Sequence, residues 1–249
     1  MKNLKLLLAA AIITASFHFG YAQSRIEINN DIHLYPIGDS IFVHVTFESS
    51  EQFGRFSSNG LIFIKNGEAI MIDTPMDNHK TEIIHKYLQN RLNANLTKLI
   101  IGHFHDDCLG GLDYIQNQGI ESIANLLTVN KCSELGLPIP STPFSDSLAI
   151  IFQGELVMCR FLGGGHTADN ITVWFPNQKL LFGGCLIRST QSQNLGNLSD
   201  AVVDQWATTV KKVLEKYPNV ELVIPGHGRW DGKELLLHTI ELAEKADEK

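Results

Sequence analysis

One short segment of the sequence concentrates side chains that bind metal ions. His103, His105 and Asp107 lie two residues apart in the run Gly-His-Phe-His-Asp-Asp-Cys at 102–108. In an extended segment, which we expect here, these three side chains project to one side. Two imidazoles and a carboxylate are suitable zinc ligands, so the triplet indicates a metal site. The alternative for the triplet alone is a polar loop that caps a helix.

Three further donors occur in glycine-rich turns at the ends of apolar runs. His166 follows three glycines, Cys185 follows two, and His227 lies between two. In such turns the backbone can approach a ligand closely. A catalytic zinc usually takes three protein ligands and leaves one position for water. Six donors therefore predict two zinc ions, with a hydroxide shared between them as the nucleophile.

The other histidines and cysteines lack this context. Five histidines fall in expected strands or helices with no donor nearby in the sequence. We expect each of them to lie at the surface or to be buried with its ring nitrogens hydrogen-bonded: His33, His44, His79, His85 and His238. Cys132 and Cys159 are expected to be small, buried apolar side chains.

Strands mixed with helices must position the donors. Apolar or alternating runs predict strands at 32–35, 41–47, 61–64, 69–72, 99–101, 148–152, 155–162, 170–175, 179–183 and 221–224. Asn66-Gly67 predicts a tight hairpin between two of them. Helical periodicity is found at 77–92, 111–117, 125–135, 199–217 and 231–246. This mixture, present in both halves, predicts an α/β fold with helices outside the sheets, and the proline-rich stretch 136–147 predicts a connection within one domain.

The N-terminus has the features of a signal peptide. Lys2 and Lys5 precede an apolar run at 6–15, and Gly20-Tyr21-Ala22 provides small residues for cleavage before Gln23. The run is shorter than the roughly 20 apolar residues of a membrane-spanning helix, which argues against the alternative of an uncut anchor. We expect a signal peptide at 1–22, a single mature domain at 23–249 and export to the periplasm.

The composition is that of a globular, acidic chain. The 249 residues are 44% hydrophobic and 19% charged, with a formal net charge of −7. Removal of residues 1–22 leaves 18 basic against 27 acidic residues, a net charge of −9. This balance argues against nucleic acid or an anionic membrane surface as a partner. Export would permit two disulfides among the four cysteines, although a chain of this length can bury a core without them.

The sequence resembles the metallo-β-lactamase superfamily over essentially the whole mature chain. The His-Phe-His-Asp-Asp run fits its HxHxD motif, and His166, Cys185 and His227 follow in the superfamily's order. The resemblance implies an αββα sandwich, in which two mixed β-sheets carry helices on their outer faces. It also implies a dinuclear zinc site between the sheets.

Within the superfamily, the sequence resembles the first, broad-spectrum subclass of class B β-lactamases. Cys185 stands where hydroxyacylglutathione hydrolases, lactonases and tRNA-processing nucleases use a bridging Asp, and Cys108 stands where they generally have a His. His103, in place of Asn, separates the chain from the single-zinc carbapenemase subclass. The segments 183–188 and 195–198 are also similar to the first subclass.

The resemblance implies a role for each site residue. His103, His105 and His166 would bind the first zinc, and Asp107, Cys185 and His227 would bind the second. A bridging hydroxide would attack the lactam carbonyl, with Asp107 and Asn197 in catalytic roles and Asn197 assisting the oxyanion. Arg188 would grip the substrate carboxylate where the subclass most often has Lys. Phe53 would cover the substrate from a flap at 47–56.

Each of the last three roles has a structural alternative. Arg188 could be a surface charge, Asn197 a turn residue, and the segment 47–56 an exposed hairpin tip. Cys108 adds a thiol near the second metal, and we expect oxidation to inactivate the enzyme, with a disulfide between Cys108 and Cys185 as one route.

The sequence therefore predicts an exported, monomeric zinc β-lactamase that opens penicillins, cephalosporins and carbapenems and confers antibiotic resistance. One rival is a hydrolase of the same fold that acts on thioesters or lactones. The other is an exported zinc-binding protein without useful catalysis.

Overall fold

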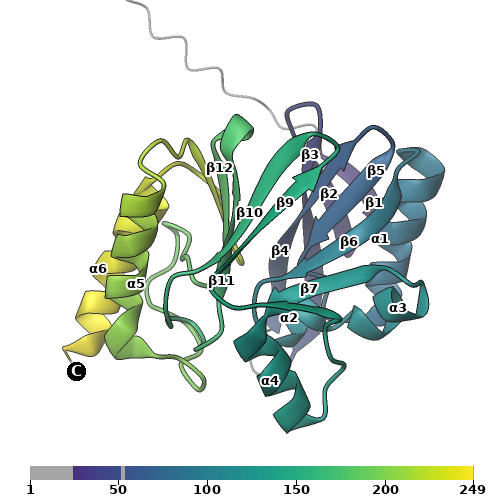
Figure 1. The fold of residues 1–249 in the computed structure, drawn as a ribbon. Coiled ribbons are helices and arrows are strands. Elements are labelled where there is room, and N and C mark those ends of the chain that lie inside the picture. The colour runs from purple at the N-terminus through teal and green to yellow at the C-terminus, as the bar shows by residue number, and fades with distance from the viewer. Residues whose placement is uncertain (1–24, 52–53, 249) are drawn as a thin grey trace, which may run out of the picture.

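The computed structural model describes residues 25–51 and 54–248, and its strands form two β-sheets (Figure 1). The first sheet has eight strands in chain order, antiparallel from β1 to β5 and parallel from β5 to β8. Its strands are β1 (Ile26–Asn29), β2 (Ile32–Ile37), β3 (Ile41–Ser50), β4 (Gly54–Lys65), β5 (Glu68–Ile72), β6 (Asn95–Ile101), β7 (Glu121–Asn125) and β8 (Thr142–Phe144). The sheet is therefore mixed.

The second sheet has five strands in the order β13-β12-β11-β10-β9. Its strands are β9 (Ser147–Phe152), β10 (Glu155–Phe161), β11 (Ile171–Phe175), β12 (Leu180–Gly184) and β13 (Leu222–Pro225). Only β12 and β13 pair in parallel, so this sheet is mixed as well. Parallel neighbours need a crossover connection, and a helix forms it here.

Helices cover the outer face of each sheet (Figure 1). The helices are α1 (Asn78–Arg91), α2 (Asp106–Leu109), α3 (Leu112–Asn117), α4 (Leu126–Leu135), α5 (Val203–Lys216) and α6 (Glu234–Asp247), with one 3₁₀ turn, η1 (Pro176–Gln178). α1 and α3 lie against the first sheet, whereas α5 and α6 lie side by side against the second. The expected αββα sandwich is confirmed.

Three apolar layers hold the sandwich together. Between the sheets, Phe63 packs against Phe152 and Phe175, with ring centroids 5.8 and 5.4 Å apart. A second layer joins the first sheet to α1 and α3, and a third joins the second sheet to α5 and α6 around the fully buried Trp206. Each such side chain contributes about 1.5–3 kcal/mol when it leaves water.

Three strands were not predicted, and one expected helix begins later than expected. β1 and β7 were not predicted, and β8 lies inside the stretch 136–147 that we expected to be a simple connection. β8 is a three-residue edge strand that contains Pro143, which weakens its signal in the sequence. The helix expected from residue 199 begins at Val203, because the backbone N–H of Val202 donates to Gly165 O at 2.8 Å and holds the preceding segment outside the helix.

Two expectations fall outside the described residues. The signal peptide at 1–22 and the flap residue Phe53 lie there. Within 25–51 and 54–248, no helix is both long and apolar enough to cross a membrane.

Candidate metal centre

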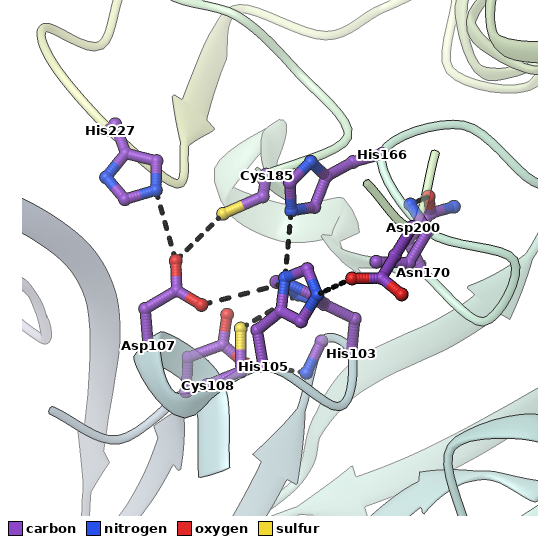
Figure 2. Close-up of polar contacts among 12 residues, drawn as sticks. His103, His105, Asp107, Cys108, His166, Asn170, Cys185, Asp200 and His227 are labelled. Carbon is purple, nitrogen blue, oxygen red and sulfur yellow. Dashed lines mark hydrogen bonds and ion pairs between the residues drawn. The ribbon is translucent and has the colours of Figure 1, made fainter. Parts of the chain in front are cut away.

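The six expected donors meet where strands of both sheets end (Figure 2). They are His103, His105, Asp107, His166, Cys185 and His227. The first three follow β6, and the other three follow β10, β12 and β13 in turn. The first sheet and the second sheet therefore supply three donors each.

The backbone at 103–107 is not extended throughout, which corrects our expectation. Asp107 lies in α2, and His105 is the N-cap residue of that helix, with φ −75° and ψ 159°. The first turn of a helix favours negative charge near its free N–H groups, and Asp106 and Asp107 occupy that turn. The helical turn directs Asp107 to the second set of donors, while its Oδ1 still lies 3.7 Å from His103 Nε2.

Three imidazoles converge on one point. His105 Nδ1 lies 3.0 Å from His103 Nε2 and 3.2 Å from His166 Nε2. Their rings meet edge to face, with centroids 4.7 to 5.1 Å apart. Neutral imidazole nitrogens gathered in this way fit a zinc ion.

A second set of donors lies next to the imidazoles. Asp107 Oδ2 is 3.2 Å from Cys185 Sγ and 3.1 Å from His227 Nε2, and the ligand atoms of the three residues lie within 4.8 Å of one another. A carboxylate, a thiolate and an imidazole also form a zinc ligand set. The donor chemistry of both sets fits the expected metal.

Each of three imidazoles is oriented by a contact on its other nitrogen. His103 Nδ1 lies 3.0 Å from Cys108 Sγ, and His105 Nε2 lies 3.1 Å from Asp200 Oδ2. The Nδ1–H of His227 donates to Ser57 O at 2.7 Å. Such partners fix the ring orientation of a metal ligand and set which nitrogen faces the metal.

For three donors the electrostatics favour the protonation state that binds a metal, whereas, against burial, the charges of Cys185 and Asp107 raise the pKa values of His103 and His227 in the metal-free centre. A hydrogen bond with Cys108 lowers the pKa of Cys185 to about 6, which favours the thiolate. Burial alone would raise the pKa of Asp107. The hydrogen bond from His227 and the charge of His103 outweigh burial and hold this pKa well below its ordinary value. Burial lowers the pKa of His166, so its ring stays neutral. These are the forms that bind zinc.

A buried carboxyl supports the segment that carries the first donors. Asp73 is 1% exposed and accepts the backbone N–H of Gly102 at 2.6 Å. Burial raises the pKa of Asp73 to about 8. Asp73 was not predicted from the sequence, because it lies 29 residues before Gly102 with no recognisable spacing. Asp200 and the carbonyl of Ser57 were not predicted either, because they lie far from their partners in the sequence.

A cavity of about 780 Å³ opens over the donors. His105, Asp107, His166 and His227 line it together with apolar groups from Met76, Phe104 and Leu137. The residues expected to meet a substrate, Arg188 and Asn197, line it too. This volume is typical of a small-molecule site.

The four cysteines are buried and unpaired in the structure. Cys132 and Cys159 are fully enclosed by apolar neighbours, as expected. Cys108 and Cys185 both lie at the metal centre without a disulfide, and their Sγ atoms contact His103 and Asp107, respectively (Figure 2).

Known proteins are similar to this chain in sequence and fold. The chain is 40% identical over 224 residues to a metallo-β-lactamase type 2 from Bacteroides fragilis, covering 90% of both chains. The chain belongs to the metallo-β-lactamase family. A metallo-β-lactamase type 2 from Bacillus cereus is 32% identical, covering 85% of this chain and 82% of the relative. Protein-family profiles give no match.

Solved structures of metallo-β-lactamases agree with this assignment. One from Pontibacter korlensis superposes with a TM-score of 0.83 at 32% identity, covering 86% of this chain and 99% of the other. Another, from Pseudomonas aeruginosa and solved in a mono-zinc form, has a TM-score of 0.82 at 31% identity, covering 88% and 98%. Membership in the metallo-β-lactamase family implies zinc as the metal of this centre.

Proposed function

We propose that the protein hydrolyses the amide bond of β-lactams with two zinc ions and so confers antibiotic resistance. His103, His105 and His166 would hold the first ion, and Asp107, Cys185 and His227 the second. The observation that carries the proposal is the adjacency of these two donor sets beside a cavity of about 780 Å³, whose lining includes two members of each set. Zinc bound there supplies a Lewis acid and lowers the pKa of water to roughly 7.

Arg188 is proposed to bind the carboxylate of the substrate. Its backbone is fixed by Thr239, whose Oγ1 accepts the Arg188 N–H at 2.8 Å. Its guanidinium lines the cavity, and its buried Nε has no hydrogen-bond partner among the described residues. A planar guanidinium can bind a carboxylate through two hydrogen bonds.

Asn197 is proposed to assist the developing oxyanion. Its Oδ1 accepts the N–H of Ser199 at 3.1 Å, which is the turn role considered above. That contact uses only the amide oxygen and leaves the Nδ2–H groups available to a substrate in the cavity. Turn formation and oxyanion stabilisation are thus compatible. A donor of this kind typically contributes about 10²–10³-fold to the rate.

Penicillins, cephalosporins and carbapenems are the proposed substrates, in keeping with the broad-spectrum subclass. We further propose that residues 1–22 direct export to the periplasm and that the mature chain, 23–249, is a monomeric single domain. Hydrolases of thioesters or lactones generally have a His at the position of Cys108 and a bridging Asp at the position of Cys185. The two cysteines therefore support β-lactams over thioesters or lactones as the substrates.

Hydrolysis assays with the mature protein test the proposal. We expect turnover of a chromogenic cephalosporin and of a carbapenem that a chelator abolishes and zinc restores, with about two zinc ions bound per chain. Turnover of a thioester or lactone without β-lactam cleavage would favour the first rival. Tight zinc binding without hydrolysis of any acyl substrate would favour the second.

A further inference from the structure

A second cavity, of about 550 Å³, adjoins the metal centre. It shares Ser57 and Gly228 with the first cavity, and none of the six proposed metal ligands lines it. Ser57 accepts the hydrogen bond of His227, so the wall between the two cavities includes the support of a metal ligand. The proposed hydrolysis does not use this space.

Aromatic rings form the walls of the second cavity. Tyr35 and Trp230 meet edge to face, with ring centroids 5.3 Å apart and ring planes at 72°. Phe47 forms another part of the wall, and the Arg55 guanidinium stacks 4.6 Å from its ring centroid. Arg55 is itself held by an ion pair of 2.8 Å with Asp31. Because the rings are already positioned, a flat aromatic ligand could bind without reorganisation of the wall.

The lining of this cavity carries one guanidinium, Arg229, and one carboxylate, Asp231. The exposed Arg229 guanidinium lines it and forms no hydrogen bond or ion pair with any residue in 25–51 or 54–248. The carboxylate in the lining, Asp231, already accepts the N–H of Gly232 at 3.0 Å. An uncommitted guanidinium is suited to a carboxylate, which it can bind through two parallel hydrogen bonds.

We propose that this cavity is a second binding site, which takes an aromatic carboxylic acid. The ring lies among Tyr35, Phe47 and Trp230, and the carboxylate lies on Arg229. The proposal does not rest on the proposed hydrolysis, because the recognition elements of this site lie outside both donor sets.

Tryptophan fluorescence of the zinc-loaded protein tests the proposal. Of the three tryptophans, Trp230 lines the cavity, whereas Trp206 is a buried residue of α5 and Trp174 packs against Tyr217. Benzoate, benzamide and benzylamine carry the same ring with negative, neutral and positive substituents. We expect a saturable change in emission, with benzoate binding about tenfold more tightly than benzamide and benzylamine binding weakest, as a charge-assisted pair predicts.

Three variants assign the signal. Arg229→Gln should remove the preference for benzoate, and Trp230→Phe should remove the change in emission. Lys86→Gln, which removes an exposed cation from α1, should behave as the parent protein. The proposal is wrong if emission shows no saturable change, if benzylamine binds as tightly as benzoate, or if the benzoate preference survives Arg229→Gln. These readouts do not depend on β-lactam hydrolysis.

Discussion

Single contacts decide which atom each histidine presents to the metal centre. His105 uses Nε2 for Asp200 and is left with Nδ1, whereas His227 uses Nδ1 for Ser57 and is left with Nε2. His103 has Cys108 at its Nδ1 and also presents Nε2. The same residue type thus supplies different atoms because its outer partners differ.

Replacement of Cys185 by Ser tests the second donor set. We expect Cys185→Ser to lower the zinc content from about two ions to about one per chain, because a serine hydroxyl does not ionise near neutral pH as this thiol does. The rate of β-lactam hydrolysis should fall by roughly 10²-fold. Zinc measured by mass spectrometry and steady-state kinetics check this. Cys132→Ala, which changes a buried thiol of α4, is the control and should keep both values.

His44 gives a prediction for the pH dependence of stability. It is 2% exposed, and its Nε2–H donates to Asp73 O at 3.0 Å. Burial lowers the pKa of His44 to about 4, from an ordinary value near 6.5. The unfolded chain therefore takes up this proton between pH 6.5 and 4 while the folded chain does not. The stabilisation is complete above pH 6.5 and is lost as the pH falls to 4.

The His44→Gln variant isolates this effect. Glutamine keeps a donor for the carbonyl but does not titrate, so its free energy of unfolding should fall less steeply between pH 6.5 and 4. We expect the difference in slope to amount to about 3 kcal/mol over that interval. Urea unfolding of the zinc-loaded parent and variant measures it, since metal-linked protonation is common to both. Equal slopes would contradict the prediction.

At the scale of elements, one side chain fixes the loop that follows β13. Asn59 on β4 donates its two Nδ2–H groups to Pro225 O and Gly228 O, each at 2.9 Å. Its backbone N–H donates to Gly226 O at 2.8 Å. These bonds bracket His227 on both sides, so a strand of the first sheet positions a ligand carried by the second.

Removal of that side chain should weaken the second donor set more than the first. Asn59→Ala leaves the buried carbonyl of Pro225 and the carbonyl of the more exposed Gly228 without their donor, at a cost of about 1–3 kcal/mol in stability. We expect zinc affinity at the Asp107, Cys185 and His227 set to fall about tenfold, with the histidine set little changed. Competition with a fluorescent zinc chelator separates the two affinities. An equal loss at both sets would show general destabilisation instead.

Elements with strong local signals were predictable, and elements formed by tertiary contacts were not. The Asn66-Gly67 hairpin and the helix at 77–92 follow from turn and capping chemistry, and Asp77 does cap α1 by accepting Lys80 N–H at 2.7 Å. The four-residue helix α2 is too short to show helical periodicity in the sequence. The strand β8 is defined by its pairing with β7, which the local sequence does not indicate. The donor types were visible in the sequence, whereas Asp73 and Asp200 act across distances that only the fold sets.

For the whole molecule, the two donor sets join the two halves of the sandwich. Each set combines residues that follow β6 with residues that follow strands of the second sheet. Zinc bound by either set would therefore cross-link the sheets, and the unfolded chain would not retain such a site. Metal binding should therefore raise the free energy of unfolding of the entire fold.

Removal of zinc should lower the melting temperature of the protein. At free zinc about 100 times the dissociation constant, each site adds about 2.7 kcal/mol, and for a chain of this size each kcal/mol corresponds to about 2–4 °C. We expect a chelator that removes both zinc ions to lower the melting temperature by about 10–20 °C and Cys185→Ser to show a smaller drop. Magnesium in place of zinc should not restore the loss, because nitrogen and sulfur donors favour zinc. An unchanged melting temperature after complete zinc removal would mean that the donor sets do not connect the sheets energetically.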